Sequence, residues 1–497
     1  MKRRSFIKTA AVAATGFTIV SPNILAGKNY STPSEKISVA LIGCGTQGIR
    51  QLMDHITNDG VRFVAVCDPT KSTNNYIEYF DGELKNKIRS FLGDQRWDEN
   101  EVGCRAGREV AKEIIERYYL NISDGKEKIT CRDYEDYRVL LEKENDLDAV
   151  YIMTPDHHHA SISVAAMRKG KHVIMHKPMA TTVAETRYVA KVAKETGVAT
   201  HMFCAESIHT TPLLSEWIWD GAIGNVTEVH NWSTRPVWPQ GWTKYPEEKM
   251  DIPEGFNWDL WLGPAKYREY NSAYTHSLFR GWKDFGTGAL GDMGHYSFRQ
   301  IFQMLKLELP VKVEASANIV SEIENQYWLA KPTDISYPNA SIVHFDFPER
   351  DGMPPVKLNW YDGCLRPPLP KELEIEGRKM PNEGLLIVGD KGKILGGFRG
   401  DSPRIIPESK MREYKRPEEY LERPIDGFDQ WVNACKGGKP SSARFEAVAK
   451  LTETICLGNI ALRFDDKLNY NSEEMRFENS EEANNYLTRE IRDGWEF

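Results

Sequence analysis

Ile37-Ser-Val-Ala-Leu-Ile42 followed by Gly43-Cys44-Gly45-Thr46-Gln47-Gly48 is the stretch that decides the fold of this 497-residue chain. The first six residues are mostly apolar, which is typical of a strand buried on both faces. The glycine-rich turn leads into a helical pattern over residues 49–56. A strand, a GxGxxG turn and a helix in this order are typical of the first unit of a dinucleotide-binding sheet.

Further strands and helices alternate along the next hundred residues. Val61–Cys67 reads as a strand ending at Asp68, and residues 149–153 and 172–175 read as short buried strands separated by an Ala-rich helix. A highly charged segment with helical periodicity, about 71–128, looks like an insertion. Alternation at this spacing predicts an α/β fold with a doubly wound parallel sheet.

Beyond about residue 225 the pattern changes to longer alternating strands, a hairpin and a late helix. Strands are expected at 226–233, 311–318, 341–347 and 357–361, a hairpin at 384–395 and a helix at 444–463. We therefore divide the chain into a leader and tether (1–35), a dinucleotide-binding domain (36–180) and a substrate domain (181–497).

Composition excludes several classes of protein. The formal net charge of −8 argues against a nucleic-acid surface, and no apolar run of membrane length follows the leader. The eight cysteines form no CxxC pair and have no metal-ligand spacing, so we expect no metal. Most lie among apolar residues, and burial as small hydrophobes is favoured over disulfides or catalysis.

The first 26 residues have the charged start, apolar centre and small final residues of a signal peptide. Lys2-Arg-Arg-Ser-Phe-Ile-Lys8 resembles a twin-arginine signal, with a plain secretory signal as the alternative. Twin-arginine systems carry folded proteins, which would allow a cofactor to bind before export. The expected location is the periplasm.

The glycine turn predicts a cofactor. Its glycines, at positions 43, 45 and 48, allow a pyrophosphate to approach the backbone at a helix N-terminus, where Cys44, Thr46 and Gln47 complete the turn. Asp68 ends the next strand and can accept a hydrogen bond from a ribose 2′-hydroxyl, while repelling a 2′-phosphate. NAD is therefore favoured over NADP. The alternative is a turn that needs glycine for structural reasons alone.

Two further motifs follow strands and should lie at the carboxyl edge of the sheet. They are Thr154-Pro155-Asp156-His-His-His159 and Gly170-Lys-His-Val-Ile-Met-His176-Lys177-Pro178. Consecutive histidines at a helix start point in different directions, so an Asp156 N-cap with solvated histidines is favoured over a metal site.

A strand ending in TPxxxH, an Ala-rich helix and GKHVxxxKP together resemble the glucose-fructose oxidoreductase/inositol dehydrogenase/MocA family. The resemblance implies that Thr154, Pro155 and His159 lie near the nicotinamide. It also implies that Lys177 assists proton transfer at a substrate hydroxyl. His176 stands where the family usually has glutamate, and we expect both His176 and Lys177 to contact the cofactor.

The third motif, Gly286-Thr-Gly-Ala-Leu-Gly-Asp292-Met-Gly-His295-Tyr296, opens a helix. Many family members carry an aspartate and a histidine four residues apart here, close to the reacting hydroxyl. In this chain the histidine is three residues on, and Tyr296 holds the fourth position. Either offset shares a helical face, so we expect Asp292 and His295 beside Lys177 as catalytic residues, with Tyr296 as the alternative contact to substrate. An imidazole beside a carboxylate suits a general base near neutral pH. A helix cap with a structural histidine is the competing interpretation.

Eight of the thirteen tryptophans fall between residues 217 and 282. Aromatic faces with polar side chains between them suit a polyhydroxylated ring. The candidate substrate contacts here are Arg235, Trp238, Tyr274, His276 and Arg280. Packing in a core or a subunit interface is the alternative, and is favoured for Trp217, Trp219, Trp258 and Trp261.

The resemblance covers nearly the whole mature chain, and the run 483–495 is similar to tails of exported Bacteroidetes members. It implies an open, mainly antiparallel C-terminal sheet through which homo-oligomers form. The expected activity is oxidation of a carbohydrate ring hydroxyl, C3 being a candidate position, in which the hydrogen on the ring carbon passes as hydride to tightly bound NAD. The alternatives are an NAD-dependent glycosidase resembling glycoside hydrolase family 109, which oxidises the ring transiently and eliminates the aglycone, and a binding protein without turnover.

Overall fold

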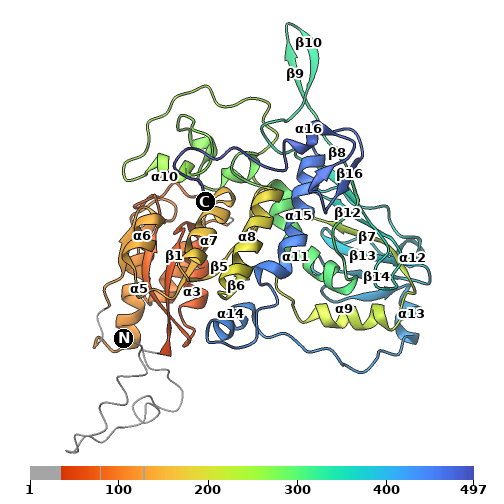
Figure 1. The fold of residues 1–497 in the computed structure, drawn as a ribbon, viewed down its shortest axis with the longest axis horizontal. Coiled ribbons are helices and arrows are strands. Elements are labelled where there is room, and N and C mark those ends of the chain that lie inside the picture. The colour runs from red at the N-terminus through yellow and green to blue at the C-terminus, as the bar shows by residue number, and fades with distance from the viewer. Residues whose placement is uncertain (1–34, 79, 127–128) are drawn as a thin grey trace, which may run out of the picture.

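The fold is described from a computed structural model that covers residues 35–78, 80–126 and 129–497 (Figure 1). The predicted export signal and nearly all of the tether lie outside these residues. Among the described helices, none has the length and apolarity that crossing a bilayer requires.

The N-terminal part contains a six-stranded, entirely parallel sheet in the order β3-β2-β1-β4-β5-β6. The order reverses between β1 and β4, which is where open α/β sheets bind ligands. The predicted doubly wound fold is confirmed. The sheet includes β6 and so continues past residue 180, the predicted domain boundary. Its strands are β1 (Ile37–Ile42), β2 (Val61–Cys67), β3 (Arg132–Tyr134), β4 (Ala149–Ile152), β5 (His172–Met175) and β6 (Thr200–Met202).

Helices pack against both faces of this sheet. Successive residues of a strand point to opposite faces, so each strand contributes side chains to two apolar cores. In β1, Val39 and Leu41 contact one apolar core, and Ala40 and Ile42 contact the other. The helices of this part are α3 (Thr46–His55), α4 (Glu83–Leu92), α5 (Arg108–Ile122), α6 (Tyr137–Lys143), α7 (His159–Arg168) and α8 (Val183–Thr196).

The charged insertion is helical, as predicted, and belongs to the N-terminal core. Leu84 and Ile88 of α4 and Ile114 of α5 are fully buried in the same cluster as β1. All eight cysteines are free thiols, and five of them are buried, which confirms their interpretation as small hydrophobes.

The C-terminal part is built on a nine-stranded sheet in the order β15-β14-β13-β7-β12-β11-β8-β16-β17. Only β7 and β12 pair in parallel, so the expected mainly antiparallel sheet is confirmed. Its strands are β7 (Val226–Trp232), β8 (Lys312–Ala317), β11 (Ser341–Phe347), β12 (Val356–Tyr361), β13 (Gly384–Gly389), β14 (Lys393–Gly396), β15 (Arg404–Ile406), β16 (Leu468–Asn471) and β17 (Arg476–Phe477).

Three long helices contribute to the core on one face of this sheet. Phe298 of α11 packs edge to face on Phe345 and Trp360, and Leu451 of α15 lies in the same cluster. The opposite face carries half-buried polar side chains such as His230 and His344. The long helices are α9 (Thr210–Trp219), α11 (Gly288–Met304) and α15 (Phe445–Ala461), and the shorter ones are α12 (Lys371–Ile375), α13 (Glu408–Glu413), α14 (Gly427–Cys435) and α16 (Glu481–Asn484).

A long connection between β7 and α11 forms the upper side of the molecule in Figure 1, beside α7. It contains α10 (Trp258–Leu262) and the short 3-10 turns η3 (Ser272–Tyr274) and η4 (Leu278–Gly281), and it has an aromatic core of its own. The hairpin of β9 (Val320–Glu324) and β10 (Tyr327–Lys331), which the sequence analysis missed, projects from the body. The connection therefore carries the predicted aromatic residues towards the carboxyl edge of the parallel sheet.

Candidate active site

The glycine turn has the geometry that a dinucleotide requires. Gly43 has a φ of +96°, and a Cβ there would lie 2.5 Å from the carbonyl carbon of Met153. A Cβ on Gly48 would lie 2.1 Å from the Gly43 oxygen. Larger residues are therefore excluded where β1 meets α3, which leaves the backbone at the helix N-terminus open to a pyrophosphate.

Asp68 lies where a ribose is expected. Its carboxylate is buried and accepts hydrogen bonds from the backbone N–H of Cys44 at 2.6 Å and of Thr70 at 2.7 Å. Burial raises the pKa of Asp68, and these two bonds oppose that rise. Each carboxylate oxygen has a second lone pair, so a ribose hydroxyl can still donate to it. The residues present therefore fit NAD.

One cleft joins the glycine turn to residues of the two motifs that follow β4 and β5 and to the turn η4 before α11, whereas residues 286–296 of the third motif are not part of its lining. Its lining includes residues from both domains: Gly43, Gly45, Thr46, Gln47, Gly48, Asp68, Tyr76, Thr154, Pro155, His158, His176, Lys177, His276 and Arg280. The structure thus gathers most of the predicted cofactor residues along one edge of the sheet.

Lys177 and Asp292 form a buried ion pair across the two domains. Lys177 follows β5, Asp292 lies in the first turns of α11, and the Lys177 Nζ donates to Asp292 Oδ1. Arg280 Nε donates to the same oxygen at 3.2 Å. Burial alone would raise the pKa of Asp292, but these two cations hold it well below its usual range. The carboxylate is therefore ionised and keeps Lys177 positioned.

His295 does not join this pair, contrary to the sequence prediction. Its Nδ1 lies 2.8 Å from the Gly291 oxygen and its Nε2 lies 3.3 Å from the Thr452 hydroxyl. The ring is fully buried, and burial lowers its pKa to about 3. Because His295 follows Asp292 by three residues and not four, its side chain points towards Thr452 of α15. Tyr296, four residues after Asp292, lies instead near the pair, with its ring centre 5.8 Å from the Lys177 Nζ.

The three adjacent histidines are buried, so the prediction that they are solvated was wrong. The Nε2 atoms of His157 and His158 both lie within 3.0 Å of the Trp261 oxygen. His159 lies between the oxygens of Thr154 and Pro178, at 3.0 and 2.5 Å. His159 therefore connects the two motif loops, behind the cleft lining. No group of three metal-binding side chains occurs in the described part of the chain.

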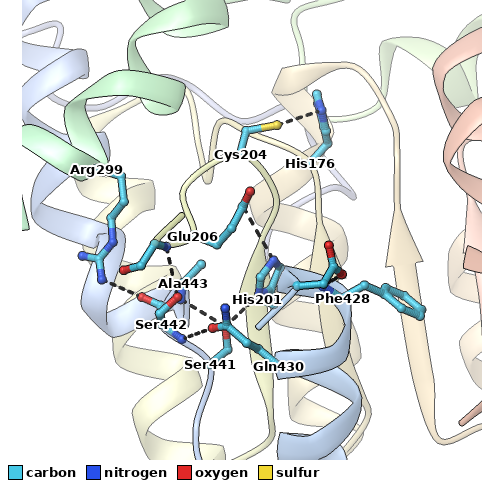
Figure 2. Close-up of polar contacts among 12 residues, drawn as sticks. His176, His201, Cys204, Glu206, Arg299, Phe428, Gln430, Ser441, Ser442 and Ala443 are labelled. Carbon is cyan, nitrogen blue, oxygen red and sulfur yellow. Dashed lines mark hydrogen bonds and ion pairs between the residues drawn. The ribbon is translucent and has the colours of Figure 1, made fainter. Parts of the chain in front are cut away.

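His176, which stands where glutamate is usual, lines the cleft as a neutral imidazole. Burial, together with the charge of Lys177, lowers its pKa well below the ordinary value. Its Nε2 lies 3.5 Å from the Sγ of Cys204, as Figure 2 shows. Cys204 belongs to no sequence motif, so nothing in the sequence marks it as a site residue.

Of the five predicted substrate contacts, His276 and Arg280 line the cleft. Trp238 and Tyr274 are buried: the Trp238 indole donates to Gln240, and Tyr274 packs in the aromatic core. Arg235 lies beyond the end of β7 and pairs with Glu383 at 3.8 Å. These three predictions are corrected, because Trp238 and Tyr274 find their partners within the long connection and Arg235 pairs with Glu383 outside it.

Tyr76 is a further cleft residue that sequence analysis missed, since it comes from the charged insertion. Its ring stacks on His276 with the ring centres 4.0 Å apart. It also covers the glycine turn, because a Cβ on Gly45 would lie 3.0 Å from a Tyr76 ring carbon. A pyrophosphate at the turn would therefore contact this ring or displace it.

Comparison with curated proteins finds relatives that act on sugars. The chain is 33% identical over 149 residues to a levoglucosan dehydrogenase of Pseudarthrobacter phenanthrenivorans, covering 28% of this chain and 35% of that protein. It is 29% identical over 180 residues to a dTDP-3,4-didehydro-2,6-dideoxy-alpha-D-glucose 3-reductase of Streptomyces violaceoruber (34% and 51%). A glycosyl hydrolase family 109 protein of Shewanella baltica is 24% identical over 210 residues (39% and 37%). The matches thus span about a third to a half of each relative.

Among solved structures, the WlbA dehydrogenase of Bordetella pertussis, in complex with NADH and UDP-GlcNAcA, shares the fold. Its sequence identity is 15%, the TM-score is 0.51, and the alignment covers 88% of this chain and 99% of that one.

Two family models match the sequence itself. "Oxidoreductase family, NAD-binding Rossmann fold" matches residues 108–203. "Oxidoreductase family, C-terminal alpha/beta domain" matches residues 214–333 and 355–497, which is more than half of the chain. Together with the NAD-compatible turn and the two-domain fold, these matches establish that the chain belongs to the Gfo/Idh/MocA oxidoreductase family.

Proposed function

We propose that the protein oxidises a ring hydroxyl of a sugar or glycoside, with C3 as the candidate carbon, using tightly bound NAD. The observation that carries this proposal is the Lys177–Asp292 pair, since Lys177 lines the same cleft as the glycine turn. Bound NAD would supply the hydride acceptor; the protein would supply orientation and proton transfer.

The chain's own residues divide this work. Asp292 fixes Lys177, whose ammonium can bind the reacting hydroxyl and stabilise negative charge on its oxygen. Tyr296 is the side chain beside Lys177 with an exchangeable proton, and it takes the role that the sequence analysis gave to His295. Lys177 would relay the hydroxyl proton, giving one of its ammonium protons to the Asp292 carboxylate as it accepts that of the hydroxyl, with Tyr296 beside this relay.

Native purification tests this proposal. Mass spectrometry of small molecules released from the protein should find NAD in near-stoichiometric amount. Adding sugars without free cofactor should then raise the absorbance of reduced nicotinamide by at most one equivalent. Protein without bound nicotinamide, or protein that shows no reduction with any sugar, would instead support a binding protein without turnover.

The family 109 relatives favour a second candidate, an NAD-dependent glycosidase that oxidises the ring transiently and eliminates the aglycone. Both candidates share hydride transfer, but only the glycosidase releases an aglycone. Incubation with nitrophenyl glycosides separates them: a keto-glycoside without free nitrophenol indicates a dehydrogenase, and nitrophenol release without net reduction indicates a glycosidase.

We also propose, from residues 1–26, folded export to the periplasm as in Bacteroidetes members of the family. Replacing Arg3 and Arg4 together by lysine should retain the protein in the cytoplasm; unchanged export would indicate a plain secretory signal. The face of the nine-stranded sheet that bears His230 and His344 is the proposed homo-oligomer interface. Analytical ultracentrifugation of wild type and His344→Glu tests it, since a monomeric wild type would rule it out.

A further inference from the structure

A stripe of polar residues runs along α11 away from Lys177. Asp292, Tyr296 and Arg299 are spaced four and three residues apart and so lie on one face of the helix. Seven residues of helix rise about 10 Å, which is longer than one sugar ring. The Tyr296 ring lies 5.8 Å from the Lys177 Nζ and 5.7 Å from the guanidinium carbon of Arg399. A substrate bound at Lys177 can therefore extend towards Arg399.

Two guanidinium groups lie near one carboxylate at the far end of this stripe, and one of them is paired with it. We call Arg299, Arg399 and Glu206 the arginine cluster. Arg399 contacts Glu206 Oε1 at 3.4 Å, whereas Arg299 donates to the backbone oxygen of Ser442 at 2.8 Å, as Figure 2 shows for Arg299. No carboxylate of the described residues forms an ion pair with Arg299. One positive charge of the cluster is thus uncompensated.

Several polar atoms of the cluster are buried without hydrogen-bond partners among the described residues. These are the Nε atoms of Arg299 and Arg399 and the Oε2 of Glu206. The nearest ring nitrogen, His201 Nε2, lies 4.0 Å from that oxygen, and burial lowers the pKa of His201 to about 3, so it adds no charge at neutral pH. Burial also lowers the pKa of Arg299, to about 10, which leaves it charged. Unpaired buried charge is costly, and an added anion would offset that cost.

The charges near Lys177 are balanced differently. Lys177 and Arg280 both contact the carboxylate of Asp292, and the charges of both also act on the buried carboxyl group of Asp156. The excess positive charge is therefore that of the arginine cluster, in a chain whose net charge is −8. A locally positive site on a protein of negative net charge attracts anionic ligands.

We propose that the sugar substrate carries a carboxylate, as in a uronic acid or its glycoside, and that Arg399 binds this group. The side chain of Arg399 is 26% exposed, so a ligand can reach it, and a guanidinium matches a carboxylate with two parallel hydrogen bonds. This inference rests on the proposed function for the sugar itself, and adds the chemical class of that sugar.

Isothermal titration calorimetry of the protein as purified, with its cofactor, tests the proposal. The probes are methyl β-glucuronide, methyl β-glucoside and glucose 6-phosphate. Wild type should bind the glucuronide roughly tenfold to a hundredfold more tightly than the glucoside, as expected for a charge-assisted pair. Arg399→Gln should remove this preference, Arg399→Lys should keep part of it, and Arg412→Gln, at an exposed arginine of α13, should leave it unchanged.

Equal affinity of wild type for glucuronide and glucoside would overturn the proposal, as would a preference that persists in Arg399→Gln. Tighter, Arg399-dependent binding of the sugar phosphate would overturn the carboxylate assignment. The readout is binding, so it separates this inference from the proposed function. A glucuronide preference without nicotinamide reduction supports the carboxylate site and contradicts oxidation. Equal nicotinamide reduction by neutral and acidic sugars supports oxidation and contradicts the carboxylate site.

Discussion

The two halves of the cleft are built from different parts of the chain. The cofactor half is a backbone structure, in which Gly43 and Gly48 leave no room for a side chain. The substrate half consists of side chains from separate segments, Lys177 after β5, Arg280 in η4 and Asp292 in α11, that meet at one carboxylate oxygen. Substitutions in the cofactor half should therefore weaken NAD binding. Substitutions in the substrate half should lower the rate of oxidation while NAD remains bound.

The largest expected effect belongs to Lys177→Met in the substrate half. Loss of the ammonium should lower kcat roughly a thousandfold, within the usual range for a positioned proton-transfer group. The NAD content after native purification should stay within about twofold of wild type, because the glycine turn is untouched. Lys169→Met, at an exposed lysine after α7, is the matched control. Loss of bound NAD together with activity in Lys177→Met would contradict the claim that the substrate half acts independently of cofactor binding.

In the cofactor half, Gly43→Ala should reduce NAD affinity roughly a hundredfold, since strain and a backbone clash cost about 3 kcal/mol. Gly170→Ala separates strain from clash: Gly170 has a φ of +72°, but no atom lies within 4 Å of its Cβ position. We expect Gly170→Ala to lose about 1 kcal/mol of stability and to retain NAD. Equal NAD retention by both variants would contradict the assignment of the turn.

Tyr296→Phe and His295→Gln sharpen the picture of the substrate half. Tyr296→Phe should lower kcat tenfold to about a hundredfold with little change in stability. His295→Gln should keep kcat within about threefold but lower the free energy of unfolding by about 1–2 kcal/mol, because its ring is buried and hydrogen-bonded. Steady-state rates and urea unfolding measure both. The opposite pattern would restore His295 as the proton acceptor.

Asp68→Asn tests the ribose position. Removing the negative charge should shift the ratio of NAD to NADP affinity roughly tenfold towards NADP, since repulsion of a 2′-phosphate is relieved. Fluorescence titration of protein stripped of nicotinamide gives both dissociation constants. Asp146→Asn, at an exposed aspartate before β4, should leave the ratio unchanged. An unchanged ratio in Asp68→Asn would place the ribose elsewhere.

The smallest effect concerns pH. Burial lowers the pKa of His201 to about 3, so as pH falls below about 6.5 the unfolded chain takes up a proton that the folded chain does not. Stability is therefore lost as pH decreases, by about 1.4 kcal/mol for this group at pH 5.5. Urea unfolding at pH 7.5 and 5.5 should show a difference smaller by that amount in His201→Gln. An unaltered difference would mean that His201 is protonated in the folded protein.

Sequence reasoning succeeded where neighbouring residues determine the structure. The strand 37–42, the glycine turn, and the positions of Asp68 and Lys177 follow from short motifs whose backbone geometry is local. It was less successful where the outcome depends on packing between distant segments. The side chain of His295 was placed on the wrong side of α11 because helical offsets of three and four residues cannot be distinguished without the helix's neighbours. Tyr76, Cys204 and Arg399 belong to no motif and reach the site only through the tertiary fold.

The most direct test of the account is a single turnover with a perdeuterated sugar and the nicotinamide that copurifies with the protein. Mass spectrometry of the released cofactor should find one deuterium on the nicotinamide ring, and Lys177→Met should show almost none in the same interval. A cofactor that remains undeuterated while the sugar is converted would contradict hydride transfer in this cleft.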